Sequence, residues 1–502
     1  MTLTAVARGA QFQPALPSFD ERCSMNLDDT IVAIATPPGC GGIGVVRLAG
    51  PEAREIVAPM LRLTHAVEPG RVIFGELIDP ESSTRIDEVV VSYFQKPHSY
   101  TTDDIIEISA HGSPVVLRRI VELALARGAR IAEPGEFTMR AFLNGRLDLT
   151  QAEAVRDLIE SQTLFQAKVA ARQLEGSLSK TLKPVKQELV ELIALLEAGI
   201  DFAEDDVSIA PDAMILEHIA TVQVPLEELA ASFAYGKLVH EGLTLAIVGR
   251  PNVGKSSLFN CLVERDRAIV TAQPGTTRDL VSETVAISGI PVRLVDTAGI
   301  RRALDEAESI GIRKSMEALA DADLVLVVLD ASQAASEEDC ELLRQVEGRA
   351  AIVVENKCDL KNSQFSVLSS QSAPSIQYMV PNARSDEMPI VSVQTSVQSV
   401  VRTSALTGEG IAELRAAILR HVGGESGPQV ESGFLTNVRH QKLVNDALAR
   451  LDAARNAIPA HVPHEMLLLD LYAALRALDE ITGATTTDDI LNLIFGTFCI
   501  GK

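Results

Sequence analysis

The sequence predicts a multidomain protein of mixed class, with an N-terminal α+β domain, a helical domain in two separated pieces, and an α/β domain inserted between those pieces. Three observations lead to this prediction. The chain has 502 residues, which suits about three domains. Short apolar runs alternate with helix-like stretches in its middle part, as they do in a mainly parallel sheet flanked by helices. Segments of helical periodicity precede and follow that part, and we expect them to pack together.

These patterns also place the domain boundaries. In chain order we expect a disordered extension at 1–25, the N-terminal α+β domain at 26–143, the first helical piece at 144–238, the α/β domain at 239–424, and the second helical piece at 425–502. The extension lacks a basic cluster followed by an apolar core, so it does not resemble a secretory signal.

Local signals support the first two domains. The N-terminal domain begins with β-like runs at 30–35 and 45–48, on either side of a Pro-Pro-Gly-Cys-Gly-Gly turn. In the helical piece, Thr150 and Glu153 have the spacing of a capping box, in which both side chains satisfy free amides at a helix start. A second helix is expected from Pro184 to Leu196.

The α/β domain is expected to contain four buried strands, because four apolar runs have strand length; they lie at 243–248, 292–295, 324–329 and 351–354. Residues 361–402 are instead rich in Ser, Gln and Val without a clear period. We interpret them as a loop insertion on the surface, although loops of this length are uncommon in compact domains. The alternative, a partner-binding loop, has no support from individual residues.

Composition limits the classes of partner and compartment. A formal net charge of -23 argues against a general polyanion binder, so any RNA partner must meet a local basic patch. The six cysteines form no CxxC pair, which is typical of reduced thiols in a cytoplasmic protein. No uninterrupted apolar run approaches the roughly 18 residues that a membrane span needs.

A glycine-rich turn follows the first expected strand of the α/β domain. Residues Gly249–Ser256 match the pattern GxxxxGK[ST], in which glycines let main-chain amides surround phosphate oxygens. Lys255 would supply a positive charge to the outer phosphates, and Ser256 a hydroxyl to Mg²⁺. The strand before the turn and the helix-like run after it favour this interpretation over a simple glycine turn.

Three further segments occur in the order typical of P-loop GTPases. Asp296–Gly299 ends an apolar run, which would place the Asp carboxylate near the metal and the Gly amide near the γ-phosphate. Asn356–Asp359 resembles the guanine-reading NKxD motif, because a carboxylate at Asp359 can accept two N–H bonds that guanine offers and adenine does not. Ser404–Leu406 resembles the main-chain clamp on the base oxygen.

The residues expected to contact GTP come from these segments and from the stretch at 271–277: Asn252, Val253, Gly254, Lys255, Ser256, Ser257, Thr271, Ala272, Gln273, Pro274, Gly275, Thr276, Thr277, Asp296, Thr297, Ala298, Gly299, Asn356, Lys357, Cys358, Asp359, Ser404, Ala405 and Leu406.

Hydrolysis must be organised differently from that in Ras-like GTPases, because Ile300 occupies the position of their water-orienting Gln. Besides Lys255, the candidates are Asn252 in the P-loop, Thr277, which could reach Mg²⁺, and Glu308, which could position the attacking water. Each also has an ordinary interpretation, Asn252 as a turn residue and Glu308 as an acid on a solvated helix.

From about Asp28 to Lys502 the chain resembles the MnmE family of tRNA-modification GTPases. The resemblance depends on the segments 29–39, 134–138 and 141–149, the nucleotide motifs, and the terminal Cys499-Ile-Gly-Lys502. It implies a tetrahydrofolate-binding N-terminal domain that also forms homodimers, a discontinuous helical domain, and an inserted P-loop GTPase domain with a Ras-like sheet.

The resemblance further implies a function. The chain would act with an FAD-dependent MnmG protein, in a heterotetramer or larger complex, to add a C5 (carboxymethyl)aminomethyl group to the wobble uridine of tRNA. The one-carbon unit would come from a 5-formyl or methylene form of tetrahydrofolate, and GTP hydrolysis would drive a conformational change.

Individual residues carry over from the family motifs by position. They imply a K⁺ site, a catalytic acid and a folate site, at the following residues of this chain: Asn252, Thr271, Gln273 and Thr276 for K⁺, Glu308 as the acid, and Arg47, Glu107, Arg146 and Lys502 for folate. A cation between transferring phosphates would do the work of an arginine finger. Cys499 has two interpretations, a reactive thiol or a structural, folate-adjacent residue. Cys40 and Thr102 depart from the family pattern, which has Arg and Gly there.

Two alternatives remain open. One is a GTPase switch that regulates ribosome or RNA assembly without modification chemistry, and folate binding would distinguish it. The other is an ATP-using enzyme, which Asp359 disfavours.

Overall fold

The computed structural model describes residues 28–201, 211–263, 282–296, 322–333, 335–360, 375–379, 390–394, 397–421, 434–484 and 501. The chain forms two compact units, one of Met1–Leu147 with Asp488–Lys502 and one of Asp148–Thr487. The extension expected at 1–25 lies outside the described residues. No helix within the described ranges combines the length and the apolar character that crossing a membrane requires.

The first unit contains, in its described part, a seven-stranded sheet of order β3-β4-β5-β6-β2-β1-β7. Its strands are β1 Ile31–Ile34, β2 Gly41–Ala49, β3 Leu61–Leu63, β4 Val72–Ile78, β5 Arg85–Phe94, β6 Ile105–Gly112 and β7 Arg130–Ile131. Neighbours are antiparallel except β1 and β7. The helices are α1 Ala53–Val57, the 3-10 turn η2 Ala58–Met60, α2 Pro114–Leu125 and α3 Glu136–Leu143. The strands expected at 30–35 and 45–48 are therefore confirmed as β1 and β2.

Alternation of side chains explains which face of this sheet is covered. Along β5, Val89, Val91 and Tyr93 are buried while the intervening side chains are more exposed, as expected for a strand with one face in a core. Leu117 and Ile120 of α2 pack into the same core. The α+β character predicted for this part of the chain is thus present.

A buried ion network supports α3 in this unit. Arg140 and Glu136 are completely buried and paired with each other at 2.9 Å, while Asp29 and Arg130 complete the network. Burial raises the pKa of Asp29, but hydrogen bonds from Arg130 and Arg140 outweigh that effect and hold its pKa below the usual value. The network ties Asp29, just before β1, to α3.

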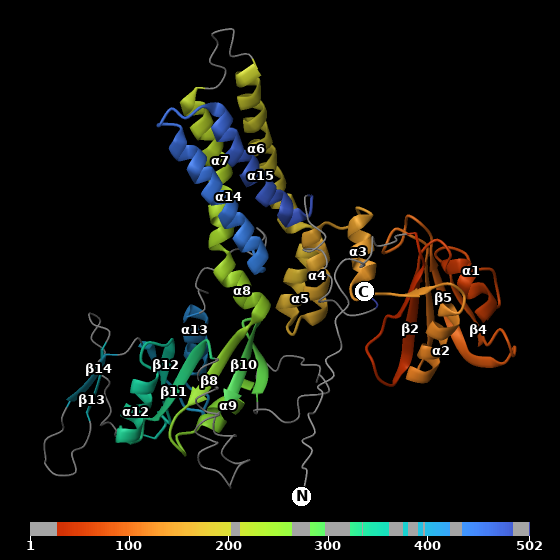
Figure 1. The fold of residues 1–502 in the computed structure, drawn as a ribbon. Coiled ribbons are helices and arrows are strands. Elements are labelled where there is room, and N and C mark those ends of the chain that lie inside the picture. Colours follow the sequence, from red (N-terminus) through yellow and green to blue (C-terminus); the bar gives the residue numbers. More distant parts are fainter. Residues whose placement is uncertain are drawn as a thin grey trace, which may run out of the picture. The chain divides into compact units, whose positions relative to one another are not determined.

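In the second unit, helices from two distant parts of the sequence share one core. They are α4 Leu149–Glu160, α5 Leu164–Leu174, α6 Ser177–Asp201, α7 Asp212–Ala231, α8 Phe233–Glu241, α14 Val438–Ala457 and α15 His464–Thr482. Side chains of α6 and α7, such as Leu189 and Ile219, pack with Leu451 of α14 and Leu471 of α15. Figure 1 shows these four helices side by side. The expectation that the two helical pieces pack together is confirmed.

Two details predicted for the helices are wrong. The capping box of α4 consists of Asp148 and Gln151, so Thr150 lies within the helix and Glu153 is used elsewhere. Asp148 is a good N-cap in its own right, and it stands at the position that actually precedes the helix. In addition, α6 begins at Ser177 and continues through Pro184, because the burial of apolar side chains on both sides of the proline outweighs the missing hydrogen bond.

The α/β part of this unit has, in its described residues, a six-stranded sheet of order β15-β12-β11-β8-β10-β9. Its strands are β8 Leu243–Val248, β9 Ser282–Ile287, β10 Ile290–Asp296, β11 Leu324–Asp330, β12 Ala351–Asn356 and β15 Val397–Arg402. All neighbouring pairs are parallel except β9 and β10. Helices α9 Lys255–Val263, α12 Glu337–Gln345 and α13 Ile411–His421 accompany it. The four strands predicted from apolar runs are confirmed.

The stretch at 361–402 is not a loop throughout. Its last part forms β15, which pairs with β12, and β13 Ser375–Met379 pairs with β14 Ile390–Gln394. The prediction failed because β15 lies at the end of the sheet, where Ser399 and Val400 are only half-buried, so its apolar pattern is weaker than that of a central strand.

Candidate functional site

The turn at Gly249–Ser256 joins the carboxyl end of β8 to α9, in the middle of the parallel sheet. Two positions of this turn require glycine, because other atoms of the protein lie too close to leave room for a Cβ. A Cβ on Gly249 would lie 2.4 Å from the carbonyl oxygen of Val328, and a Cβ on Gly254 would lie 2.2 Å from the amide nitrogen of Asn356. Gly254 also has a φ of +94°, in a region that side chains disfavour. The backbone is therefore a tight turn ending at a helix start, where anions bind.

The P-loop lysine already faces polar oxygens of this turn. The Lys255 ammonium donates to the carbonyls of Gly249 at 2.8 Å and Arg250 at 2.7 Å. Asn252 has a φ of +66°, a conformation that Asn tolerates better than most residues. The ammonium is thus positioned where it can exchange main-chain carbonyls for phosphate oxygens.

An anchor for the turn was not expected from the sequence. The guanidinium of Arg250 donates to Asp339 at 2.7 Å, and the Asp339 side chain is 1% exposed. Asp339 also forms a capping box with Ser336 at the start of α12. The Ser336–Asp339 spacing could have identified the cap, but no sequence signal pointed to its contact with Arg250.

Asn356 joins three of the predicted segments. Its amide nitrogen donates to the carbonyl of Val253 at 2.9 Å. Its amide oxygen accepts from the Ala405 N–H at 3.0 Å and from the Thr403 hydroxyl at 3.3 Å. Leu406 is exposed. The structure thus brings the P-loop, the Asn356 segment and the Ser404 segment together at one edge of the sheet.

Lys357 is held by a carboxylate that the sequence interpretation did not include. Its ammonium pairs with Asp330 at 2.6 Å. Burial raises the pKa of Asp330, but hydrogen bonds from Lys357 and Ser332 outweigh it and keep the pKa low. Burial raises the pKa of the Cys358 thiol, so Cys358 is a poor nucleophile. Asp359 is half-buried at the end of this segment, where its carboxylate is accessible.

Several candidates cannot be placed, because they lie outside the described residues: Thr271, Ala272, Gln273, Pro274, Gly275, Thr276, Thr277, Thr297, Ala298, Gly299, Glu308, Cys499 and Lys502. Asp296 ends β10, as its motif requires. Of the residues expected at Mg²⁺ or K⁺, Ser256 and Asn252 lie within the described P-loop.

A second candidate site lies in the first unit, that of Met1–Leu147 with Asp488–Lys502. It contains three of the residues carried over for folate. Arg47 and Glu107 face each other on β2 and β6 and are paired at 2.8 Å. The guanidinium carbon of Arg47 is 5.8 Å from the ring centre of Tyr100 and 5.5 Å from that of Phe137. The guanidinium carbon of Arg146 is 5.3 Å from the same Tyr100 ring. Two guanidinium groups therefore lie close to the Tyr100 ring, and one of them is paired with the Glu107 carboxylate.

Tyr100 and Phe137 were missed as site residues, although Phe137 lies within the recognised segment 134–138 and Tyr100 lies two positions before Thr102. Burial raises the pKa of Tyr100, even though Thr138 and the two arginines act in the opposite direction. Its hydroxyl lies 3.0 Å from that of Thr138. The ring is thus a fixed, neutral surface between charged groups, which suits stacking of a flat heteroaromatic ligand.

The carboxyl-terminal tail reaches this cluster. The carbonyl of Gly501 accepts a hydrogen bond from Arg47 at 3.4 Å. A Cβ on Gly501 would lie 2.4 Å from the carbonyl oxygen of Ile34, so the close approach requires glycine. This position explains why a residue next to Lys502 belongs with side chains more than 450 positions earlier in the chain.

The two departures from the family pattern have different consequences. Thr102 has a φ of +66°, so it keeps the left-handed backbone that the Gly usually found there adopts easily, at a cost of about 1 kcal/mol. The neighbouring carbonyl of Thr101 accepts from Asn144 at 2.6 Å, which helps to hold the loop. Cys40 is exposed.

Two family models match the chain. A family model described as "MnmE helical domain" matches residues 149–499. A second model, "GTP-binding protein TrmE N-terminus", matches residues 30–146. Together they span both the Arg47 cluster and the P-loop.

Full-length relatives are similar to the chain almost from end to end. The tRNA modification GTPase MnmE of Koribacter versatilis (strain Ellin345) is 66% identical over 482 residues, which cover 95% of this chain and 100% of that protein. The tRNA modification GTPase MnmE of Aquifex aeolicus (strain VF5) is 42% identical over 475 residues, covering 94% and 100%. Among solved structures, the G domain of the T. maritima FeoB iron transporter is 26% identical with a TM-score of 0.25, covering 36% of this chain and 98% of that one. With two matching family models and relatives of this identity, the chain belongs to the MnmE family of tRNA-modification GTPases.

Proposed function

We propose that this GTPase is the GTP-hydrolysing component of a complex that adds a C5 (carboxymethyl)aminomethyl group to the wobble uridine of tRNA. Its partner would be an FAD-dependent MnmG protein, and its one-carbon donor a 5-formyl or methylene tetrahydrofolate. The observation that carries the one-carbon part is the pair of guanidinium groups of Arg47 and Arg146 at the Tyr100 ring, with Arg47 paired to Glu107.

The nucleotide roles follow from the turn after β8 and its neighbours. Main-chain amides of the P-loop and Lys255 would bind the phosphates, and Asp359 would select guanine by accepting its two N–H groups. Ser256 and Thr277 would hold Mg²⁺, which neutralises charge on the phosphates. Glu308 would orient the attacking water.

The folate roles follow from charge and shape. A pterin ring would stack beside Tyr100, while Glu107 accepts hydrogen bonds from its N–H edge. Arg47 and Arg146 would pair with the pterin carbonyl or the glutamate tail, as guanidinium groups do with oxygen acceptors. Lys502 would add a further positive charge. For Cys499, the structural, folate-adjacent role is the proposal.

Homodimerisation through the first unit is supported by an exposed apolar face. Val72 and Phe74 of β4 and Phe94 of β5 are 70%, 53% and 41% exposed. The strand register places all three on one face of the sheet, since Val72 lies opposite Ser92 and Phe74 opposite Val90. Exposed large apolar side chains that share one face of a sheet are typical of a protein interface.

Folate binding tests the proposal. In a titration of the full-length protein with 5-formyltetrahydrofolate, Glu107→Ala is expected to weaken binding at least about tenfold, because it removes a charged hydrogen-bond acceptor. Glu122→Ala, an exposed acid on α2 of the same unit, serves as the control and is expected to bind like the unmodified protein.

No binding by the unmodified protein would favour the alternative, a regulatory GTPase switch without modification chemistry. Loss of the C5-modified wobble uridines from the tRNA of cells lacking the gene is the matching result in vivo, and their persistence would contradict the proposal.

The proposed K⁺ site predicts a dependence on the monovalent cation. GTP hydrolysis is expected to be several-fold faster in KCl than in NaCl, because a cation gripped by Asn252, Thr271, Gln273 and Thr276 neutralises charge between the transferring phosphates. Steady-state phosphate release at matched ionic strength measures it. Equal rates in the two salts would refute the role of Asn252.

A further inference from the structure

The hairpin of β9 and β10 connects two segments of the proposed nucleotide site. β9 begins at Ser282, shortly after the 271–279 stretch, and β10 ends at Asp296, directly before Thr297. The two strands pair without interruption from Ser282 opposite Val295 to Ile287 opposite Ile290. A shift at the nucleotide end of this hairpin is therefore transmitted to its other end, the turn at Ser288–Gly289.

Helix α5 of the helical part sits on that turn. The hydroxyl of Thr163, the N-cap of α5, donates to the carbonyl of Gly289 at 2.6 Å. Gly289 has a φ of +88°, and a Cβ on it would lie 2.5 Å from the Cβ of Phe165. The contact is thus close packing against the backbone, with no space for a side chain between the helix and the hairpin.

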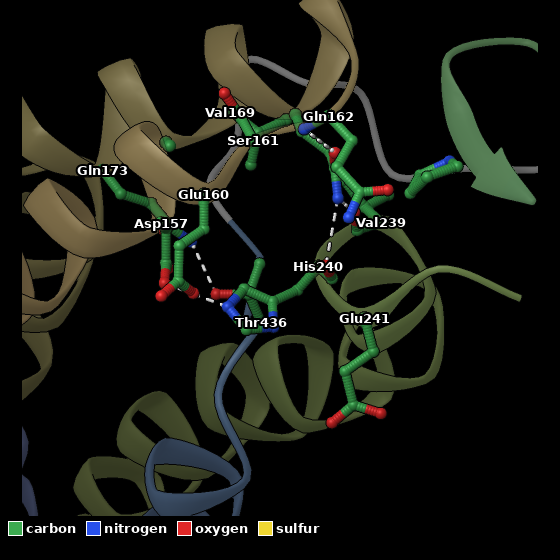
Figure 2. A pocket seen from close by; sticks show the side chains of 13 residues that line it. Asp157, Glu160, Ser161, Gln162, Val169, Gln173, Val239, His240, Glu241 and Thr436 are labelled. Atoms are coloured by element: carbon green, nitrogen blue, oxygen red, sulfur yellow. Dashed lines mark hydrogen bonds and ion pairs between the residues drawn. The ribbon is translucent and has the colours of Figure 1, made fainter. Parts of the chain in front are cut away.

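The same helix is fixed to the segment that leads to the P-loop. The side-chain amide of Gln166 donates to the carbonyls of Val239 at 2.9 Å and His240 at 3.0 Å, in the last turn of α8. In Figure 2 the His240 ring is turned toward Asp157 of α4, and its Nε2 lies 2.9 Å from the Asp157 carboxylate. From α8 the chain passes directly into β8, whose carboxyl end carries the P-loop.

The opposite end of α5 contacts the segment by which the chain leaves the α/β domain. Gln173 donates to the hydroxyl of Thr436 at 3.0 Å, just before α14 begins. Between these contacts lies a cavity of about 320 Å³, lined by residues of α4, α5 and α8, by Pro291 of β10 and by Thr436. Gln166 and Gln173 line this cavity themselves, so α5 is fixed at both ends of a space that the surrounding side chains do not fill, which leaves room for a second arrangement.

From this geometry we propose that α5 couples the nucleotide state of the β9–β10 hairpin to the helical core. Movement of the hairpin pushes or releases Phe165 and Thr163, and α5 passes the displacement to α8 and to the start of α14. Thermodynamic linkage makes the coupling reciprocal, so a partner that binds the helical core alters nucleotide affinity through the same helix. The inference rests on the GTPase activity and on the proposed nucleotide contacts of residues 271–277 and 296–299, and not on the tRNA chemistry.

Gly289→Ala tests the coupling in the full-length protein. The added methyl group must displace Phe165, whereas Gly348→Ala, at a φ of +80° with nothing within 4 Å, imposes similar backbone strain without a contact. Amide hydrogen exchange of 163–174 is measured with GDP and with a non-hydrolysable GTP analogue. The unmodified protein and Gly348→Ala are expected to differ between the two states, and Gly289→Ala to lose most of that difference, by at least about threefold.

A second pair of variants separates coupling from a loss of helix stability. Thr163→Val removes the hydroxyl that binds Gly289 and caps α5, whereas Thr163→Ser keeps it. Loss of the cap raises exchange in both nucleotide states alike, so the difference between the states is the readout, and only Thr163→Val is expected to reduce it. Identical exchange of α5 in the two nucleotide states, with nucleotide bound in both, would overturn the coupling alone. Failure of the unmodified protein to bind guanine nucleotides would overturn the proposed nucleotide site and the coupling together.

Discussion

Asp359→Asn is expected to lower the affinity for GTP by at least about a hundredfold and to create affinity for xanthosine triphosphate. The carboxylate accepts two N–H bonds from guanine. The amide that replaces it has one oxygen that can accept one of these bonds, but its NH₂ group then faces the second guanine N–H, so donor meets donor and that bond is lost. Xanthine carries a carbonyl oxygen where guanine carries its amino group, which restores the match with the new amide. Competition binding with GTP, ATP and xanthosine triphosphate measures the change.

The control for this experiment is Glu409→Gln. Glu409 is an exposed acid in the loop that carries the base-clamp segment, so its neutralisation changes the local charge equally without removing the proposed acceptor. It is expected to bind GTP like the unmodified protein. An undiminished preference for guanine in Asp359→Asn would sink the assignment of Asp359 and with it the proposed base site.

Buried elements were the most predictable part of the fold. The run at 324–329 became β11, in which every side chain is buried, because a central parallel strand needs apolar residues on both faces. By contrast, the residues of β15 at 397–402 were interpreted as part of a loop. A strand at the end of a sheet needs apolar residues at fewer positions than a central strand, so its apolar pattern is weaker. Pro184 misled in the same way: a local rule about proline cannot weigh the core that forms around α6.

In the nucleotide site, the predictable residues were those that serve the ligand directly. Gly254 and Lys255 stand at fixed positions of the GxxxxGK[ST] pattern. The spacing of that pattern is fixed because the loop must fit around phosphate groups of fixed size. The residues that hold them were not predictable. Asp339 reaches Arg250 and Asp330 reaches Lys357 across the sheet edge, and such contacts depend on strand order, which spacing along the chain does not encode.

The Arg47 cluster shows the same limit from another direction. Resemblance to a family supplied its charged residues, because they lie in recognisable motifs. Tyr100 was not among them, although its ring lies within 6 Å of the guanidinium carbons of both Arg47 and Arg146. Its place depends on how β2, the loop between β5 and β6, and the segment after α3 come together.

An ion pair between distant segments holds the two helical pieces together. Arg439 of α14 donates through two nitrogens to Glu153 of α4, at 3.0 and 3.1 Å, and His440 lies 2.7 Å from the same carboxylate. Arg439 also donates to the carbonyl of Glu480 at 2.8 Å, at the end of α15. The Glu153 side chain is only 10% exposed, so removing it would leave a mostly buried cation without its partner.

Glu153→Gln is therefore expected to lower the free energy of unfolding of the helical core by about 3 kcal/mol at pH 7. Burial raises the pKa of Glu153, but His440 and Arg439 outweigh it and hold the pKa at about 2, against 4.5 in the unfolded chain. Because the folded pKa is the lower one, this contribution is present above pH 4.5 and is lost as the pH falls toward 2. The difference between the two proteins, measured by urea unfolding or by amide exchange in α14, should shrink over that range. Glu160→Gln, an exposed acid on the same helix, is expected to cost no more than about 0.5 kcal/mol at any pH, and an equal loss in both variants would show that the buried pair does not hold the two pieces together.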